Sequence, residues 1–343
     1  RKYQSLPMTH RAKQEGWNIP TADIEIQERL HTGQGVQDVA FKARWNRMEV
    51  VVVAHSSEDG KSESEEQMQD LAILASNRRH PNLVLFLGAC IDVSPALLVY
   101  EQMGSTVHEM MRKRGLWKKV WLPPTELLLR WSQHLMLALA FLHGRDSATE
   151  TLCEITPMNL FPSQDLQTLK LGNLGFSSSN ANSRGCKDGK EASRQAKRRL
   201  KVRSKFASPE TLQGTVSETK ESQVFSAAAV IWYMTSGKVA RSPADIAGEK
   251  NDVSADPLRE SRYSPVLQGL IRRALAADPT ARPTAEDMAH ALKGVAQDHQ
   301  HMQRQSLLSA MAVSRSTSPH RKSSLSKVVG ASPEWVRNIL GEF

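Results

Sequence analysis

The sequence predicts an α+β fold in which a β-rich first third precedes a helical remainder. Short apolar stretches separated by turn residues fill the chain up to about residue 100, as antiparallel strands do. Beyond that point apolar residues recur mostly at helical spacing. Strands grouped before helices are typical of an α+β domain. With 343 residues, of which 40% are hydrophobic, the chain can bury a substantial core.

Five strands are expected in the first hundred residues, because apolar residues alternate or cluster there between turn signals. Their ranges are 24–30, 36–44, 48–54, 83–89 and 96–100. A helix is expected between the third and fourth strands, where apolar residues 68–75 fall at helical spacing. Pro81 follows this helix and cannot continue its hydrogen-bond ladder.

Four helices are expected in the rest of the chain, at 126–143, 224–234, 265–277 and 285–295. The second of these is almost entirely apolar, which predicts a helix buried on all sides. Compositional order falls away after about Gln297. A short amphipathic helix at 333–340, with Ser332 as N-cap, is the last expected element.

Charge and cysteine usage limit the classes of function. The net charge of +9 is concentrated in residues 184–205 and 304–327, which we interpret as a solvated loop and a disordered tail. Attraction of nucleic acid or anionic lipid is the alternative. Three cysteines without a CxxC pair indicate reduced thiols in a cytosolic or nuclear protein. No apolar run approaches the length of a membrane span, and the start of the chain, which lacks methionine, indicates a fragment.

Six motifs follow one another in a recognisable order and spacing. They are GWNIPTADIEIQERL at 16–30, GQGVQDVAFKARW at 33–45, HPNLVLFLGAC at 80–90, KLGNLG at 170–175, ASPE at 207–210 and DPTARPT at 278–284. Together they resemble the tyrosine-kinase-like group of protein kinases, which includes Raf, mixed-lineage and integrin-linked kinases. The resemblance covers about residues 17–297.

The resemblance implies a domain layout. A two-lobed kinase-like domain is expected at 22–297, with a small β-rich lobe carrying helix C at 22–103 and a helical lobe at 104–297. Residues 1–21 would be an extension and 298–343 a basic serine-rich tail. In the family, the glutamate of the ASPE position pairs with a later arginine, so Glu210 and Arg282 are expected to form a structural ion pair.

The resemblance also implies phosphoryl transfer, which in this family depends on positioned charges. At the position of the lysine that holds the nucleotide phosphates stands Val53, and its glutamate partner in helix C is replaced by Leu71. The nearest basic residues, Arg47 and Lys61, lie outside the apolar run. Both partners of the ion pair are therefore absent.

The catalytic loop is degenerate as well. HGRD at 143–146 looks like the catalytic motif but lacks the asparagine that must follow, so the matching frame is LCEITPMN at 152–159. Glu154 then replaces the catalytic aspartate, Thr156 replaces the lysine and Asn159 is retained. Asn173 stands where an aspartate should bind magnesium, and a neutral amide is a poorer ligand than a carboxylate.

Six residues remain at the positions of the family's nucleotide cleft: Gly33, Gly35, Val51, Glu101, Met103 and Phe161. Val51 and Phe161 are bulkier than the family's usual residues and are expected to fill the adenine slot, while Asp38 puts negative charge near the phosphates. We therefore expect weak or absent binding of ATP and magnesium, no cofactor and no metal site. Leu152 and Leu174 are expected to close a hydrophobic spine against Ala75 and Leu87.

These substitutions favour a pseudokinase scaffold in the cytoplasm that acts by binding signalling proteins. Its expected partners are 14-3-3-type phosphoserine readers or another kinase, through the phosphosites Ser306, Ser318, Ser323 and Ser332. Two alternatives stay open. One is a weakly active serine/threonine kinase that uses Glu154 as base, and the other is a nucleic-acid or cytoskeleton binder that uses the basic stretches. Sparse aromatic residues there disfavour nucleic acid.

Overall fold

The computed structural model of the chain describes residues 16–30, 39–54, 79–93, 96–112, 121–144, 155–172, 205–213, 219–237 and 263–316. The chain divides into two compact units, Arg1–Ala296 and Gln297–Phe343, and each is described by itself. The expected helices at 68–75 and 333–340 lie outside the described residues. No described helix has the length and apolar character needed to cross a lipid bilayer.

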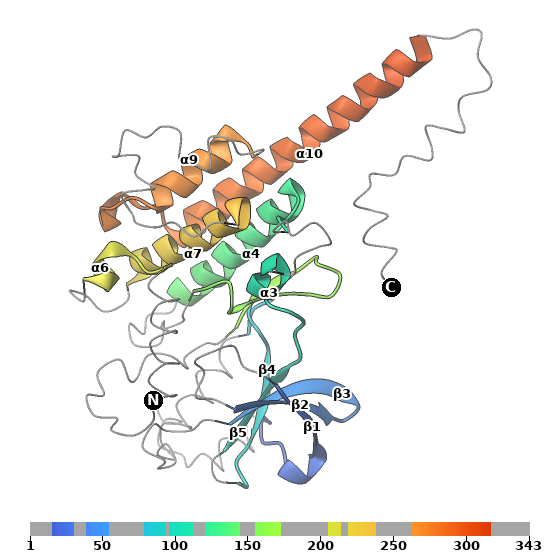
Figure 1. Cartoon of the computed structure of the whole chain (residues 1–343), viewed down its shortest axis with the longest axis vertical. Coiled ribbons are helices and arrows are strands. Elements are labelled where there is room, and N and C mark those ends of the chain that lie inside the picture. The colour runs from blue at the N-terminus through green and yellow to red at the C-terminus, as the bar shows by residue number, and fades with distance from the viewer. Residues whose placement is uncertain are drawn as a thin grey trace. The chain divides into compact units, whose positions relative to one another are not determined.

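An antiparallel sheet forms the N-terminal part, as the sequence predicts (Figure 1). Its strand order is β1-β2-β3-β5-β4. The strands are β1 (Ile24–Leu30), β2 (Val39–Trp45), β3 (Met48–Ala54), β4 (Phe86–Cys90) and β5 (Leu97–Glu101). The fourth strand starts three residues later than the expected range of 83–89, because residues 82–84 pair with a different strand, β7 (Leu169–Leu171).

A two-residue turn joins β2 to β3. Trp45 lies opposite Met48, and both connecting residues have positive φ, 46° at Asn46 and 67° at Arg47. This is the turn geometry whose twist matches that of the flanking strands. Arginine is an uncommon residue in this conformation, so the hairpin geometry overrides a local preference at Arg47.

A short strap before β1 extends the sheet beyond β4. The amide of Ala89 donates to the carbonyl of Trp17 (2.8 Å), and the amide of Ile19 donates to the carbonyl of Ala89 (2.9 Å). Gly88 makes this approach possible, because a Cβ there would lie 2.4 Å from the Trp17 carbonyl oxygen. A 3₁₀ turn (Thr21–Asp23) follows, and Asp92 accepts two hydrogen bonds from Thr21.

The two faces of β3 differ in burial. Val50 and Val52 are fully buried with Ile19, Ala43, Cys90 and Val99. Val51 and Val53 alternate with them and are half-buried on the opposite face. Two of the residues that were linked with nucleotide, Val51 and Val53, therefore share one face of the sheet.

Helices make up most of the remaining part (Figure 1). They are α3 (Val107–Arg112), α4 (Thr125–His143), α6 (Pro209–Leu212), α7 (Lys220–Ser236), α9 (Pro265–Ala274), α10 (Ala285–Ser316) and a 3₁₀ turn (Pro279–Ala281). The four helices expected from the sequence are confirmed, whereas the short α3 and α6 were not expected. β7 pairs with β6 (Leu160–Pro162) in a separate two-stranded sheet.

Helix α7 is the centre of the helical core. Thirteen of its residues are buried, as its nearly unbroken apolar sequence predicts. A capping box between Thr219 and Ser222 satisfies amides at its start, and Gly237 ends it with φ 68°. α4 contributes eight buried residues to the same core.

The last helix is longer than the sequence analysis expected. It was predicted to end at Val295, but α10 continues to Ser316. From Val295 onward this segment contains no glycine or proline, and it is rich in alanine, glutamine, leucine and methionine, which favour helix. Its side chains from Met302 to Ser309 are exposed.

Candidate functional site

The site's framework is the junction between β7 and the segment that leads into β4. The amide of Val84 donates to the carbonyl of Leu171 (3.0 Å), and the amide of Leu171 donates to the carbonyl of Asn82 (2.8 Å). The side chain of Asn82 donates to the carbonyl of Leu169 (3.0 Å). These bonds hold the strand before Asn173 against the sheet part.

Alternation along β6 and β7 sorts their side chains into two faces. Leu160, Leu169 and Leu171 are buried in the helical core. Phe161 and Lys170 are cross-strand partners and lie on the opposite face. They therefore share the face of this small sheet that is turned away from the buried leucines.

The ring of Phe161 occupies space that Gly172 leaves empty. A Cβ at Gly172 would lie 2.7 Å from Cε2 of Phe161 and 3.1 Å from Cγ2 of Val84. Real Cβ atoms do not approach other atoms as closely as 2.7 Å, so the ring position depends on the glycine. The expectation that Phe161 fills part of the adenine slot stays a prediction, and this contact supports it.

An ion pair crosses from β7 to the end of β5. Lys170 Nζ lies 2.5 Å from Glu101 Oε1, and both side chains are about one-fifth to one-quarter exposed. The same carboxylate oxygen accepts the amide hydrogen of Leu85 (2.7 Å). Glu101 therefore binds the helical part and the segment before β4 at once, just before the connection through Met103, which is half-buried.

Val53 lies opposite Ala40 on β2 and Leu98 on β5, so its immediate cross-strand neighbours are apolar. The one lysine of β2, Lys42, lies opposite Val51 and pairs with Glu49 (3.1 Å). This pairing, together with Arg44, contributes to a lowered pKa of Glu49.

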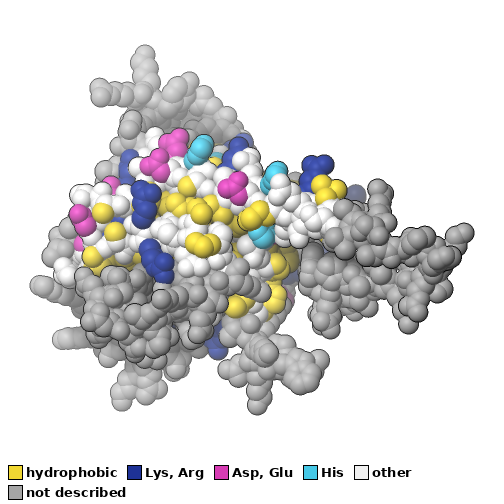
Figure 2. All heavy atoms as spheres, turned by 90° about the horizontal axis from the view of Figure 1, so that it is seen from above, with side chains coloured by type: hydrophobic (Ala, Val, Ile, Leu, Met, Phe, Trp, Pro, Cys, Tyr) yellow, Lys and Arg dark blue, Asp and Glu magenta, His cyan; other side chains and the backbone are white. Residues whose placement is uncertain are grey.

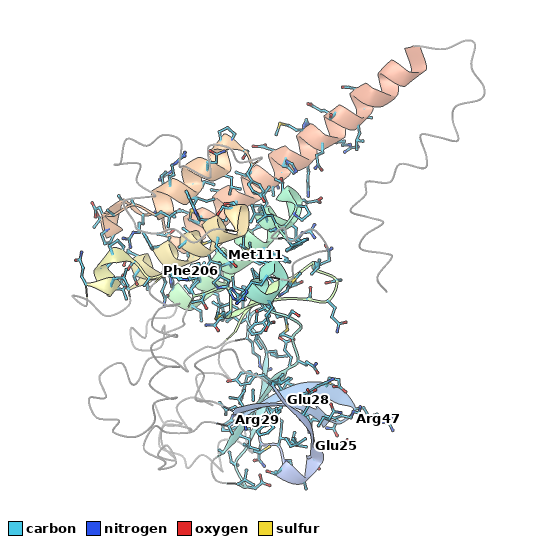
Figure 3. All side chains as sticks on the ribbon, viewed as in Figure 1. Glu25, Glu28, Arg29, Arg47, Met111 and Phe206 are labelled. Carbon is cyan, nitrogen blue, oxygen red and sulfur yellow. The ribbon has the colours of Figure 1, made fainter. Side chains whose placement is uncertain are left out.

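Arg47 cannot take the place of a lysine at Val53. It lies in the β2–β3 turn, six residues or about 20 Å of extended strand from that position. Figure 3 places Arg47 on the sheet with Glu25, Glu28 and Arg29, away from Met111 and Phe206 in the helical part.

Residues 155–159 of the expected catalytic loop at 152–159 are described, and they include Thr156 and Asn159. The amide of Asn159 donates to the carbonyl of Thr156 (3.0 Å), and the amide of Gly172 donates to the carbonyl of Asn159 (2.9 Å). Thr156, at the position of the family's lysine, is buried. The loop therefore brings Asn159 next to the start of the Gly172–Gly175 motif.

Several expected site residues lie outside the described residues: Gly33, Gly35, Asp38, Lys61, Leu71, Ala75, Leu152, Glu154, Asn173 and Leu174. The same holds for the phosphosites Ser318, Ser323 and Ser332 and for the basic stretch 184–204. Ser306 is described and is exposed on α10. Among the described residues, no three histidine, cysteine, aspartate or glutamate side chains gather as metal ligands would.

A second cluster, formed by His108, Phe206 and Tyr233, lies in the helical part. The amide of His108 on α3 donates to the carbonyl of Pro157, and its ring stacks on Tyr233 of α7. The ring of Phe206 meets Tyr233 edge-on. Burial, followed by the charge of Arg112, lowers the pKa of His108. This cluster links the loop before Asn159 to the core helix α7.

The structure places Glu210 and Arg282 in a bidentate ion pair. Nη1 and Nη2 of Arg282 donate to the two carboxylate oxygens at 2.6 and 3.0 Å. Arg282 also donates to the carbonyls of Ala276, Ala277 and Glu221. Burial would raise the pKa of Glu210, but the hydrogen bonds, chiefly from Arg282, outweigh it and leave the pKa lowered.

Two features of the site were missed by the sequence analysis, the Lys170–Glu101 pair and the dependence of Phe161 on Gly172. For the first, the sequence shows only that Lys170 stands between Leu169 and Leu171, which indicates a strand position on the opposite face from the leucines but does not identify its partner. The second has no sequence signal, since a glycine before Asn173 is equally compatible with a simple turn.

Comparison of the sequence with known proteins gives matches to protein kinases. Residues 26–292 match the protein kinase domain family. Serine/threonine-protein kinase VIK of Arabidopsis thaliana is 23% identical over 290 residues, which cover 81% of this chain and 62% of that protein. PBL34, a serine/threonine-protein kinase of the same plant, is 26% identical over 276 residues (71% of this chain, 50% of that protein).

U-box domain-containing protein 51 of Arabidopsis thaliana is 28% identical over 172 residues, which cover 48% of this chain and 21% of that protein. The chain thus spans less than two thirds of the length of each of these relatives.

Proposed function

The chain belongs to the protein kinase domain family, and from this premise we propose that it is a catalytically impaired member of the tyrosine-kinase-like group that acts as a signalling scaffold. One observation carries the proposal. The position at which the family places its phosphate-binding lysine is Val53, whose cross-strand neighbours Ala40 and Leu98 are apolar. Without a cation there, the charge of a triphosphate is not offset.

The nearby lysines Lys42 and Lys170 are already held in ion pairs, and this supports the proposal of an impaired kinase. Lys42 is held by Glu49, and Lys170 is held by Glu101. Moving either ammonium group to a phosphate would leave a carboxylate without its partner, and for the half-buried Glu101 this costs free energy. Neither lysine is therefore a ready substitute for the missing one.

The first experiment measures thermal unfolding with and without Mg-ATP. We expect no change in Tm at millimolar nucleotide, because only a ligand that binds the folded state raises it. A matched variant, V51A/F161L, enlarges the adenine slot and is expected to gain a rise in Tm with adenosine. A rise of several degrees for the unmodified chain with Mg-ATP would contradict the proposal.

As a scaffold, the chain would bind its partners through surfaces other than the nucleotide site. We propose signalling proteins of the cytoplasm as partners, with 14-3-3-type phosphoserine readers acting at Ser306 or the tail serines. Phosphorylation of purified chain at Ser306 followed by titration with a 14-3-3 protein tests this. S306A is the matched control and should bind less well.

A weakly active serine/threonine kinase is the second candidate. It is favoured by the retained Asn159, whose backbone is hydrogen-bonded to both Thr156 and Gly172, and by relatives that are named serine/threonine kinases. Glu154 would then serve as the base. Transfer of labelled phosphate that disappears in E154A, but persists in E109A on α3, would establish this activity and exclude the impaired kinase.

A further inference from the structure

Two histidines hold the junction between α4, β7 and the segment before β4. Nδ1 of His134 on α4 accepts the amide hydrogen of Leu169 (3.1 Å). Nδ1 of His80 accepts the amide hydrogen of Asn82 (3.1 Å). A backbone amide can only donate, so each Nδ1 must carry a lone pair, and each neutral ring must hold its proton on Nε2.

The two bonds belong to one connected set. The ring of His80 stacks on Phe141 of α4, with centroids 5.0 Å apart and an interplanar angle of 28°. Phe141 lies seven residues, or two turns, after His134 and so shares its helix face. Asn82 in turn binds both Leu169 and Leu171 of β7. Loss of either histidine bond therefore acts on the same strand.

We propose that this junction is an acid-sensitive joint between the sheet part and the helical part of the domain. Protonation of His80 or His134 turns its Nδ1 into an N–H donor that faces a backbone N–H donor. The bond is replaced by repulsion, and the segment at Asn82 and the strand β7 are released from α4. No ligand is needed for this change.

The charged groups around the joint, in the part of the chain that is described, do not favour protonation. Arg130 lies one turn before His134, Arg79 precedes His80, and the charges of the two rings affect one another. The cation Lys170 on β7 is paired with Glu101.

The acids on these elements are already engaged. Glu126 pairs with Arg130, Asp165 accepts hydrogen bonds within its own turn, and Asp92 binds Thr21. No described acid on α4, on the β6–β7 hairpin or in residues 79–93 is left to stabilise an added positive charge. Consistent with this, burial lowers the pKa of both His80 and His134.

The consequence reaches the candidate site. β7 leads directly into Gly172, whose amide binds the carbonyl of Asn159. Opening of the joint would therefore make the positions of Phe161, Lys170 and Gly172, on and directly after the β6–β7 hairpin, less fixed. This inference goes beyond the proposed function, because it depends on the backbone bonds of the junction and holds whether or not the chain transfers phosphate.

Amide hydrogen exchange at pH 7.5 and 5.5, corrected for the intrinsic pH dependence of exchange, tests the joint on the full chain. We expect at least about a tenfold loss of protection at Asn82 and Leu169 at the lower pH, and no comparable loss at Val52 in the sheet. In H80N/H134N, the asparagine oxygens can accept the same bonds but cannot titrate, so protection should no longer depend on pH. H290N, an exposed histidine on α10, is the control and should behave as the unmodified chain.

The proposal is overturned if H80N/H134N loses protection at pH 5.5 to the same extent as the unmodified chain. It is also overturned if nitrogen chemical shifts of the unmodified chain at pH 7.5 show the proton on Nδ1 of either ring. The second measurement needs no variant, so it decides the matter even where a substitution prevents folding. Nε2 protonation at pH 7.5 that changes to the doubly protonated ring together with the loss of protection supports the proposal.

Discussion

At the scale of single residues, Arg282 combines several interactions in one side chain. Its five N–H donors match five acceptors, namely two oxygens of Glu210 and three backbone carbonyls. Its guanidinium also lies 4.9 Å from the ring centre of Phe225. The side chain is completely buried, so each of these bonds replaces one with water.

Replacement of Arg282 should be severe and should depend on geometry as well as charge. R282M removes both Arg282 hydrogen bonds from the half-buried Glu210 and is expected to lower the free energy of unfolding by about 3–5 kcal/mol. R282K keeps the charge but loses the bidentate fork, with an expected loss of about 1.5–3 kcal/mol. Urea denaturation measures both. R44K in the exposed ion pairs of β2 is the control, with a change below about 1 kcal/mol.

Gly172 gives a second prediction at this scale. In G172A the new Cβ would overlap the ring of Phe161, so the ring must rotate away, at an expected cost of about 1–3 kcal/mol. F161L removes the overlapping atoms. The double variant G172A/F161L should therefore be more stable than the sum of the single changes predicts, as a double-mutant cycle in urea would show. Simple additivity would mean that the ring does not lie over the glycine.

At the scale of elements, the strap at Trp17–Ile19 shows how a few backbone bonds complete a sheet. Gly88 lets Ile19 and the Trp17 carbonyl approach β4, and the buried rings of Trp17 and Phe86 lie against one another. The strap brings apolar surface and two hydrogen bonds to an otherwise open strand edge.

G88A should detach this strap. Its Cβ would lie 2.4 Å from a backbone oxygen, which cannot rotate away as a side chain can. We expect faster amide exchange at Ile19 and Ala89 and increased fluorescence quenching of Trp17 by acrylamide. G269A on α9 is the control, because a Cβ there meets no atom within 4 Å. Unchanged exchange at Ile19 in G88A would show that the strap does not depend on the glycine.

Elements with a strong periodic pattern were predictable from the sequence, and those defined by pairing were not. Helices α4 and α7 were expected within a few residues, because their apolar residues follow helical spacing over many turns. The start of β4 was not predicted correctly. Residues 82–84 have the apolar pattern of a strand, and only the structure shows that they pair with β7. The continuation of α10 beyond Val295 was not expected, because compositional order falls away there although the residues that follow favour helix.

In the candidate site, one ion pair was expected from the sequence and two others were not. The pairing of Glu210 with Arg282 was implied by the resemblance to protein kinases, and the structure contains this pair. The partners of Lys42 and Lys170 did not follow. The distance between Lys42 and Glu49 depends on the register of β2 against β3, and the distance between Lys170 and Glu101 depends on how two separate sheets pack together.

At the scale of the whole first unit, Glu101 and Lys170 join the sheet part to the helical part. K170M should leave Glu101 half-buried without a cation, and E101Q should leave Lys170 without an anion. We expect each to destabilise the chain by about 1–3 kcal/mol and to speed amide exchange at Leu85, whose hydrogen bond Glu101 also accepts. The exchanged pair E101K/K170E should recover part of the loss, measured by urea denaturation.

The matched control for this prediction is the exposed pair of Lys42 and Glu49, in which K42M should change stability by less than about 1 kcal/mol. Equal effects of K42M and K170M would show that burial adds nothing to the Glu101–Lys170 pair. Figure 2 shows acidic and basic side chains intermixed around hydrophobic ones on one face of the described part of the chain.

Stability as a whole should fall in mild acid. Burial is the leading cause that lowers the pKa of His80, His108, His134 and His143 in the folded chain. Below their ordinary value of about 6.5 the unfolded chain therefore binds more protons than the folded chain, so the free energy of unfolding decreases as pH falls. Urea midpoints at pH 7.5 and 5.5 measure this. Replacing all four histidines by glutamine should flatten the dependence between those values, whereas H290Q and H301Q on the exposed face of α10 should not.

The strap before β1 has a practical consequence for anyone who shortens this chain. The family match begins at residue 26, but within the described part of the chain the hydrogen bonds of the sheet already include Trp17. A fragment of residues 26–292 would leave the outer amide and carbonyl of Ala89 unpaired and the ring of Phe86 without its cover. An uncovered strand edge beside an apolar surface is a template for strands of other molecules. Such a fragment should self-associate and precipitate, whereas one that starts at Gly16 should stay monodisperse.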